Sequence, residues 1–444
     1  MRAAMRAHPL ATAGSALVLA AALAPASPLH TGFDGRAAAG VTLATPAVYV
    51  VLSPFTRLAD ALCLLSTAQH AAVAVTLLVA AAAWKVARRC PHASALRTCA
   101  RASGACALTL VGLVVLLAGA VFAPRPMASL VAADADEVRV DFHTHTNASH
   151  DVPAWFTPER RRAWHAGAGF DVAYVSDHKR VAGAVAAGRG NPARAGAGLS
   201  VLPAIESWWN GIHVIVLGAP ALDPAFLADE QVDRALPAAL ASGRLAGQPL
   251  PVVLAAIPDD VLRALTPAAL DSAPWLRGVE VADGAPRAIA QRDREGRTIA
   301  ARAAALGILP VAATNHHGWG RTAVAWNLVR VPGWQALAPE LLGARIEDVL
   351  RRRDAAAVRV VTRARPEVAA AGAARTASLV ATLPALVWQV AAELRMAERA
   401  VWLLWLWAPA LLALVMSHAP RRARRLTPEP RPTPHVPAPS APRA

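Results

Sequence analysis

Cysteine is scarce in this chain of 444 residues, and its absence from most of the chain limits the chemistry available there. The 4 cysteines, Cys63, Cys90, Cys99 and Cys106, all lie in the apolar first third, and none forms a Cys-x-x-Cys pair. From residue 124 onward there is no cysteine. Disulfides and thiolate metal sites are therefore excluded from that part of the chain.

An excess of positive charge is also missing from the middle of the chain, although the whole sequence has a formal net charge of +15. Residues 125–375 hold 28 Lys and Arg against 25 Asp and Glu, a net charge of only +3. The flanking parts carry the remaining +12. Proteins that bind nucleic acid through its phosphates usually have a basic face on the binding domain. We therefore do not expect nucleic acid as a partner.

Apolar residues are abundant, at 55% of the chain with a mean hydropathy of +0.36, which is unusual for a soluble protein. In a membrane region at 1–123 and near the C-terminus, four segments predict transmembrane helices: 10–29, 60–84, 103–123 and 400–416. The first follows a basic start and is either a helix or a signal peptide. The piece 41–55 is short and interrupted by proline, which favours an interfacial or re-entrant segment.

Basic residues in short loops predict the orientation, because they stay preferentially on the cytoplasmic side. The loop 85–101 has five Lys or Arg and no acid, and the run RRARR at 421–425 follows the last apolar segment. Both clusters place 124–399 on the extracytoplasmic side of an integral protein of the cell membrane. An amphipathic linker and helix at 376–420 then lead to a basic, proline-rich tail at 421–444, which we expect to be a disordered cytoplasmic end.

Between about 124 and 375, short β-branched runs alternate with helical stretches rich in Ala and Arg. This alternation is typical of a mostly parallel sheet, and the number of runs predicts an α/β fold with a closed or nearly closed β/α barrel. Helices are expected at 157–167 and 286–307. The expected strands are 138–142, 171–176, 199–205, 213–218, 251–256, 278–283, 309–314 and 358–361.

Imidazole, carboxylate and amide side chains gather at the ends of these strands, where a β/α barrel places its functional residues. His143 and His145 alternate at the end of the first strand, so both point to the same side. A single histidine here is usually only a hydrogen-bonded surface group, but the joint pattern predicts a site for Zn, Mn or Fe. The residues at these ends are His143, His145, Asp177, His178, Glu206, His213, Asn315 and His317.

Other polar and aromatic residues nearby have simpler interpretations. We expect either His150 or its neighbour Asp151 to be only solvated, His165 to lie on an ordinary helix surface, and His316 to point away from its neighbours. The pair Trp208 and Trp209 follows Glu206 and either walls a pocket or packs at a rim.

Four motifs, in the same order along the chain, resemble those of the PHP family, the metal-dependent phosphoesterases named for polymerase and histidinol phosphatase domains. They are DFHTHTNASHD, VAYVSDH, LPAIESWWNGIHVIVLG, and VEVADG followed by VAATNHHG, spanning about residues 137–320. The resemblance implies a distorted (β/α)7-type barrel at 124–375, here flanked by transmembrane helices. It also implies metal ligands at His143, His145, Asp151, His178, Glu206, His213, Asn315 and His317.

Two positions depart from the family pattern. Ile257 stands where the family has a metal-binding histidine before proline, and Asn315 stands where aspartate is usual. The missing imidazole should weaken one metal position, and Asn315 contributes no charge. With Asp151 and Glu206 as the only acidic ligands, three divalent ions would leave much positive charge uncompensated. We therefore expect two ions, and a third when an anionic substrate is bound.

The resulting hypothesis is metal-dependent hydrolysis of a phosphoester bond in a small phosphorylated substrate. Two ions bridged by Glu206 would activate a shared water and clamp the phosphoryl oxygens, so no nucleophilic Ser or Cys is needed. Asp177 either orients His178 or caps a helix. Three basic residues just past the ends of ligand-bearing strands are candidates to bind the phosphate: Arg321, Lys179 and Arg180. Each of them alone is more often only a solvated charge.

Two other functions fit some of these residues. A PHP-like domain that has lost a ligand would be a non-catalytic module that binds a metal or an anion, and the residues Ile257 and Asn315 favour this alternative. A hydrolase of C–N bonds is the third hypothesis, because amidohydrolase barrels also begin with His-x-His. Those usually use a bridging lysine on a mid-barrel strand, whereas the only lysine of this domain, Lys179, lies next to His178.

The substitution Ile257→His separates the first two hypotheses. If the site is a hydrolase that lacks one ligand, the variant is expected to gain metal or activity, because it restores an imidazole donor. Metal content by mass spectrometry and phosphate release measure the two effects. An unchanged value of both would favour the non-catalytic module.

Overall fold

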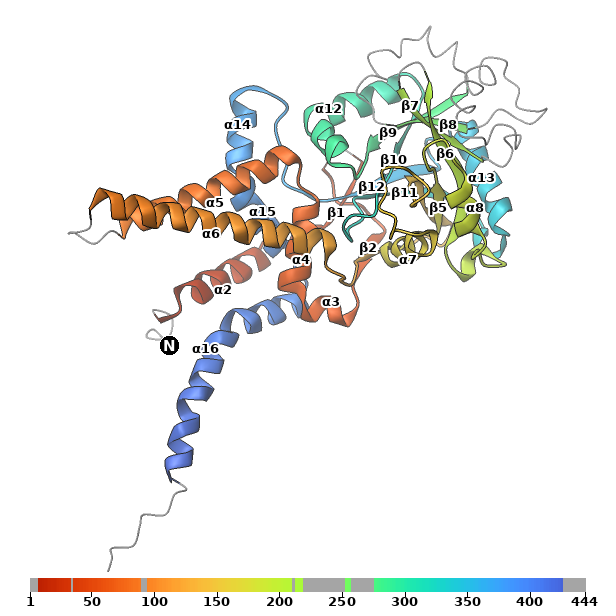
Figure 1. Ribbon diagram of the computed structural model, residues 1–444. Coiled ribbons are helices and arrows are strands. Elements are labelled where there is room, and N and C mark those ends of the chain that lie inside the picture. Colours follow the sequence, from red (N-terminus) through yellow and green to blue (C-terminus); the bar gives the residue numbers. More distant parts are fainter. Residues whose placement is uncertain are drawn as a thin grey trace, which may run out of the picture.

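The computed structural model describes residues 7–32, 35–88, 94–209, 212–218, 252–256 and 275–425. Figure 1 shows a curled sheet with covering helices on one side and a group of long helices on the other. The strands are β1 (Leu29–Thr31), β2 (Val41–Ala44), β3 (Ser129–Ala132), β4 (Glu137–Thr144), β5 (Val172–Val175), β6 (Ser200–Trp209), β7 (Ile212–Leu217), β8 (Val252–Ala255), β9 (Leu276–Ala282), β10 (Leu309–Ala312), β11 (Ala325–Arg330) and β12 (Val358–Arg363).

The helices fall into those around the sheet and those beside it. Around the sheet are α7 (Pro158–Ala168), α8 (Ala182–Gly188), α12 (Pro286–Ala305), α13 (Pro339–Arg351) and the 3-10 turns η1 (Ala195–Ala197) and η4 (Trp334–Ala336). Beside it are α2 (Pro9–Ala22), α3 (Ala47–Val51), α4 (Ser53–Cys63), α5 (Thr67–Ala87), α6 (Ala95–Phe122), α14 (Gly372–Val380), α15 (Thr382–Ala392) and α16 (Met396–Arg425).

Ten strands form one mixed sheet in the order β1-β12-β11-β4-β5-β6-β7-β8-β9-β10, and β2 pairs with β3 separately. The runs β4-β5-β6 and β8-β9-β10 are parallel, but β7 is antiparallel to both of its neighbours. Only two residues separate β6 from β7, whereas a parallel connection needs a crossover of a dozen or more. The predicted mixed α/β class is confirmed; the seven-strand β/α count and the mostly parallel sheet are not.

The strands beside the site are buried because their sequences are apolar on both faces. Every residue of β5 (VAYV) and β8 (VVLA) is buried, as expected for the interior of a sheet covered on both sides. Helix α13 covers β6, β8 and β9. Its residues Leu342, Ile346 and Leu350, four apart on one helix face, are fully buried in that core.

Three helices are long and apolar enough to cross a membrane: Thr67–Ala87, Ala95–Phe122 and Met396–Met416. At most 6% of the most apolar window of each is buried within the protein, so their apolar side chains face outward. Exposed apolar surface on this scale is rare on soluble monomers.

Two of the predicted membrane segments have different bounds in the structure. The segment 10–29 is a 14-residue helix, α2, followed by two prolines and then β1. The segment 60–84 is broken between α4 and α5, because the Ser66 side chain and the Gln69 side chain cap the start of α5 reciprocally. The piece 41–55 supplies β2, paired with β3, the short helix α3 and the start of α4, and its place at a membrane interface stays a prediction.

Buried ion pairs tie the long helices to the sheet. Arg57 of α4 holds the Glu398 carboxylate of α16 with two hydrogen bonds of 3.0 and 2.9 Å. Asp60, one helix turn further along α4, pairs with Arg125 after α6 at 2.5 Å and with Arg363 of β12 at 3.4 Å. Because a buried charge is costly unless paired, these contacts hold α4, α16 and the sheet in one arrangement.

The sheet curls until β10 contacts β11, β12 and β4, and a side-chain amide completes the contact. Asn327 of β11 is fully buried. Its amide nitrogen donates to the Ala312 carbonyl at 2.7 Å and to the Val140 carbonyl at 3.0 Å, and its oxygen accepts from the Ala312 N–H at 2.7 Å. The Asn327 amide thus takes the place of a neighbouring strand where no backbone ladder joins β10 to β4.

Replacing this amide with an apolar group of similar size should destabilise the fold. Asn327→Leu leaves the buried Ala312 N–H and C=O without partners, at about 1–3 kcal/mol each. We expect a loss of about 2 to 4 kcal/mol, seen as a thermal midpoint roughly 5 to 15 °C lower in detergent. The control Arg330→Leu, at the exposed end of the same strand, should change the midpoint little, because surface ion pairs contribute little. Equal midpoints for the two variants would contradict this role of Asn327.

Candidate metal centre

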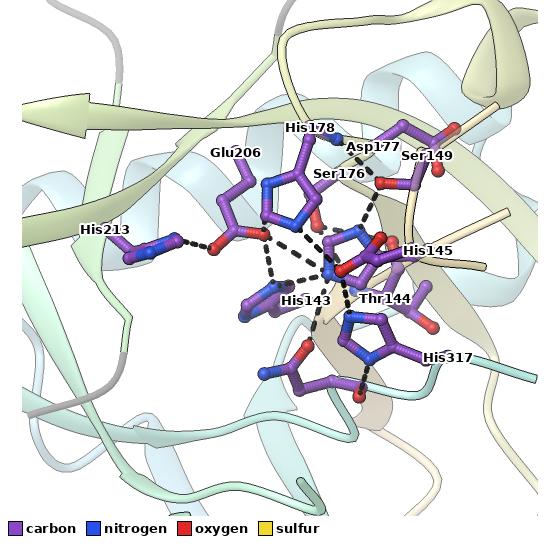
Figure 2. A network of polar contacts seen from close by, with 12 residues as sticks. His143, Thr144, His145, Ser149, Ser176, Asp177, His178, Glu206, His213 and His317 are labelled. Atoms are coloured by element: carbon purple, nitrogen blue, oxygen red, sulfur yellow. Dashed lines mark hydrogen bonds and ion pairs between the residues drawn. The ribbon is translucent and has the colours of Figure 1, made fainter. Parts of the chain in front are cut away.

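The site begins where β4 ends. His143, in β4, and His145, just after it, are both fully buried, and their Nε2 atoms lie 2.9 Å apart. Alternation along the strand sends both rings to the same side, as predicted, and Figure 2 shows them facing one another. Two imidazole nitrogens at this distance either share one hydrogen bond or act as two ligands of the same cation.

Glu206, in β6, lies at the centre of the cluster (Figure 2). Its Oε2 is 3.2 Å from His143 Nε2 and 3.3 Å from both His145 Nε2 and His178 Nδ1. Its Oε1 is 2.5 Å from His213 Nδ1 on the neighbouring strand β7. One carboxylate therefore contacts four imidazoles, which come from the ends of β4 and β5 and from β7.

The loops after β4 and β10 supply the other side of the cluster. Asp151 Oδ2 accepts from His178 Nε2 at 3.2 Å and from His317 Nε2 at 3.0 Å. Asn315 has a φ of 40°, in the left-handed region that Asn tolerates better than most residues. Its Oδ1 lies 3.2 Å from His145 Nε2. The structure thus brings all eight residues that the sequence proposed as ligands into one cluster of contacts.

Two further carboxylates join this cluster that sequence reasoning missed, Glu280 and Asp283. Glu280 lies in β9, and its Oε1 is 2.8 Å from His143 Nδ1. Asp283 follows β9 and accepts from the Asn315 amide at 2.9 Å. Both are buried. The sequence signal that could have identified Glu280 is a glutamate inside the apolar run GVEVAD. Four carboxylates instead of two can also compensate more positive charge, so the charge of the site no longer argues against a third divalent ion.

The donor set fits divalent metal ions. Four groups of three donor atoms lie within 4.8 Å of one another: His143–His145–Glu206, His178–Glu206–His213, His145–His178–His317 and His143–Glu280–Asp283. Imidazole and carboxylate are the donors that Zn, Mn and Fe take. Among the described residues, the buried Glu280 Oε2 has no hydrogen-bond partner, as expected of an atom that would face a cation.

Only some of the pKa shifts in the cluster favour the protonation states that metal binding needs. Burial opposes it, but the charges of Glu280 and Glu206 raise the pKa of His143 well above its ordinary value and favour its protonated form. Burial lowers the pKa of His145 well below its ordinary value, against the opposing charge of Glu206. Burial alone would raise the pKa of Glu206, but His143 and His213 outweigh it and hold that pKa well below its ordinary value. Burial raises the pKa of Glu280 and of Asp283, so these carboxyls lack sufficient positive partners within the protein.

Two predicted catalytic residues lie differently from expectation. The Asp177 carboxylate accepts from the Thr146 N–H at 2.6 Å and the Thr146 hydroxyl at 2.7 Å, so it neither bonds the His178 ring nor caps α8. It instead fixes the loop after β4. Arg321 is half-buried beside Arg125, and burial followed by that like charge lowers its pKa. None of its described contacts reaches the cluster.

The histidines outside the ligand set also depart in part from expectation. His165 is fully buried, not on a surface, and its Nε2 lies 2.8 Å from Asp141 Oδ2. His316 points away from the cluster, as expected, and its Nδ1 is 2.8 Å from the Arg161 guanidinium. Arg161 also donates to the backbone carbonyls of His145 and His316, so one buried arginine holds the two ligand loops together. His150 is exposed.

Trp208 and Lys179 lie at the rim of the cluster. The Trp208 ring lies over His213 at 3.9 Å between centroids, which makes it a wall of the site. Lys179, after His178, has a φ of 57° and donates its N–H to the Glu206 carbonyl at 2.9 Å. Ile257 and the Trp209 side chain lie outside the described residues.

No protein-family model and no curated protein matches the chain. Solved structures similar to it include PsfC from Pseudomonas syringae PB-5123, with 16% identity and a TM-score of 0.33 over 50% of this chain and 99% of that one. An amidohydrolase from Chromobacterium violaceum, solved with sulfate and no metal, has 17% identity and a TM-score of 0.28 over 46% and 96%. A protein from Bifidobacterium adolescentis, provisionally assigned as a metal-dependent phosphoesterase, has 19% identity and a TM-score of 0.26 over 48% and 96%. These likenesses are too distant to assign a function.

Removing the charge of Glu280 while keeping its shape should weaken metal binding. We expect Glu280→Gln to bind Mn²⁺ or Zn²⁺ at least about tenfold more weakly, or to lose one equivalent, since even outer partners of a metal contribute 10–100-fold. Titration calorimetry and mass spectrometry of the purified chain measure both. The control is Glu347→Gln, a half-buried glutamate near Tyr174. Identical affinity and stoichiometry in both variants would exclude Glu280 from the metal centre.

Proposed function

We propose that the protein is a membrane-anchored, metal-dependent hydrolase of phosphoester bonds. The observation that supports this most is the convergence of five imidazoles and four carboxylates on one buried cluster, with Glu206 in contact with four of the imidazoles. An ion pair that only stabilises the fold does not need four imidazoles around one carboxylate. A centre that binds more than one divalent ion needs several imidazole and carboxylate ligands close together.

Glu206 is the residue proposed to be shared between ions. It belongs to two of the donor groups, one with His143 and His145 and one with His178 and His213, and a third group around His317 adjoins Asp151. Divalent ions held there would supply an activated water at neutral pH and stabilise the charge of a phosphoryl group. We propose two ions, with a third made acceptable by Glu280 and Asp283.

The residues of the chain itself would position the reaction. Asp177 and Arg161 hold the loops that carry His145 and His317, so the donors are oriented before a substrate arrives. Trp208 over His213 narrows the approach from the β6–β7 side. The phosphate would therefore approach from the side of Asp151 and His317, which are partly exposed.

Membrane anchoring is proposed from the three long apolar helices. Helix α5 begins, and α6 ends, near the sheet (Figure 1). Lys85, in the last turn of α5, and Arg97, in the first turn of α6, therefore lie at the far end of this helix pair. Basic residues stay in the cytoplasm, so we propose that the metal centre faces the extracytoplasmic side.

A non-catalytic metal-binding module is the second candidate function. Asn315, in place of an acid, is the observation that favours it. Its amide oxygen nevertheless faces His145 at 3.2 Å, where a neutral donor for a metal is still available.

The proposed function predicts metal-dependent hydrolysis by the full chain in detergent. Hydrolysis of p-nitrophenyl phosphate or bis(p-nitrophenyl) phosphate should be lost after treatment with a chelator and return with Mn²⁺, Zn²⁺ or Fe²⁺. Glu206→Gln should lower kcat/KM by more than about 100-fold, because it removes a shared ligand. The control Glu340→Gln, an exposed glutamate at the start of α13, should stay within about twofold.

A protein that binds at least two equivalents of metal and hydrolyses neither ester would support the binding module instead. Hydrolysis that survives the chelator and Glu206→Gln alike would contradict both candidates.

A further inference from the structure

A cavity of about 690 Å³ runs from the metal centre to the long helices. Asp151, Asn315 and His317 line one end of it. The other end is lined mainly by apolar side chains from the end of α4, the loop after it and the last turns of α6: Leu62, Leu65, Leu117, Ala120 and Val121. Cys63, Thr67 and His70 also line the cavity there. The same cavity therefore presents metal donors at one end and a mainly apolar wall at the other.

The apolar end belongs to helices that are able to cross a membrane. Leu117, Ala120 and Val121 lie in α6, one of the three candidate spans. The Gly320 N–H donates to the Val121 carbonyl at 3.0 Å, so the loop that carries His317 rests on the end of α6. The cavity wall thus continues into the helix surface that lipid chains would cover.

Three exposed aromatic side chains mark the same boundary. Trp319 makes edge-to-face contacts with Phe122, at the end of α6, and with Trp155, in the loop after Asp151, at 5.4 and 5.7 Å between ring centroids. All three are between 43% and 62% exposed. Tryptophan and other amphipathic rings gather at the level of lipid headgroups. With α6 crossing a membrane, as proposed above, the metal centre would lie close to the membrane surface on the headgroup side.

We infer that the substrate is the phosphate ester of a lipid, with its phosphate at the metal centre and its acyl chain along the apolar end of the cavity. The inference rests on the proposed hydrolase function. A small hydrophilic ester would use only the polar end and leave the apolar wall in contact with water, which is unfavourable in proportion to its area. In the reaction, a water oxygen would bond to phosphorus, the bond from phosphorus to the lipid oxygen would break, and the lipid alcohol would leave with a proton.

The test compares esters that differ only in chain length. The full chain in detergent is given alkyl phosphates and alkyl p-nitrophenyl phosphates with chains of two to twelve carbons. Burying each methylene contributes about 0.8 kcal/mol, so kcat/KM should rise up to about three- to fourfold per methylene until the apolar end is filled. Detergent micelles also concentrate long-chain esters, which by itself changes the apparent kcat/KM. Variants of the cavity are therefore needed to separate binding in the cavity from uptake into micelles.

Leu117→Trp fills the apolar end and should reduce the ratio of twelve-carbon to two-carbon kcat/KM by at least tenfold. The control Val114→Trp adds the same ring to an exposed part of α6 and should keep the ratio. Leu62→Trp fills the cavity from α4 and replaces Leu117→Trp if that variant does not fold. Metal content of each variant shows that the centre is intact.

The outcomes distinguish this inference from the proposed function. Metal-dependent hydrolysis with the same kcat/KM at every chain length, or an equal ratio in Leu117→Trp and Val114→Trp, would overturn the lipid substrate and leave the hydrolase standing. Metal binding without hydrolysis of any ester would overturn both.

Discussion

The site depends on how the end of β10 is held against the end of β4. These strands are not neighbours in the sheet order, so a backbone ladder does not set their distance. The Asn315 N–H donates to the His143 carbonyl at 2.9 Å, and the Thr314 N–H donates to the Asp141 carboxylate at 2.9 Å. Asp141 also contacts His165 of α7. Together with the Asn327 amide and Arg161, these bonds bring the donors after β10 within reach of the two histidines of β4.

The same loop after β10 connects the metal centre to the long helices. Thr322 donates to Asp60 of α4 at 2.9 Å, and Arg125, just after α6, bonds both Asp60 and Thr322. The position of the donors thus depends on residues that precede the expected domain boundary at 124. β1 adds to this dependence because it pairs with β12. The apolar helices are therefore part of the framework of the site and not merely a tether.

Most of the ligand set could be predicted because strand alternation and strand ends are local properties. His143 and His145 needed only the period of one strand. The supporting contacts could not be predicted, because burial of a polar residue depends on a partner far away in the sequence: His165 is buried only because Asp141 meets it, and Glu280 reaches the cluster only once β9 lies beside β10. The antiparallel pairing of β6 with β7 had a local signal, because the predicted strands 199–205 and 213–218 leave about seven residues between them, too few for a parallel crossover.

The nearby carboxyl group of Asp283 explains why an asparagine, and not an aspartate, fits at position 315. Its amide nitrogen donates to Asp283 at 2.9 Å while its oxygen turns to His145. An aspartate in the same conformation would bring two buried carboxylates into contact, and such a pair cannot both remain ionised. The amide avoids that repulsion, keeps an oxygen donor directed at the cluster, and leaves Asp283 as the carboxyl group at this end of the site. A carboxyl group is therefore still present at this end of the site, in Asp283, so Asn315 alone is no sign that the site cannot bind metal.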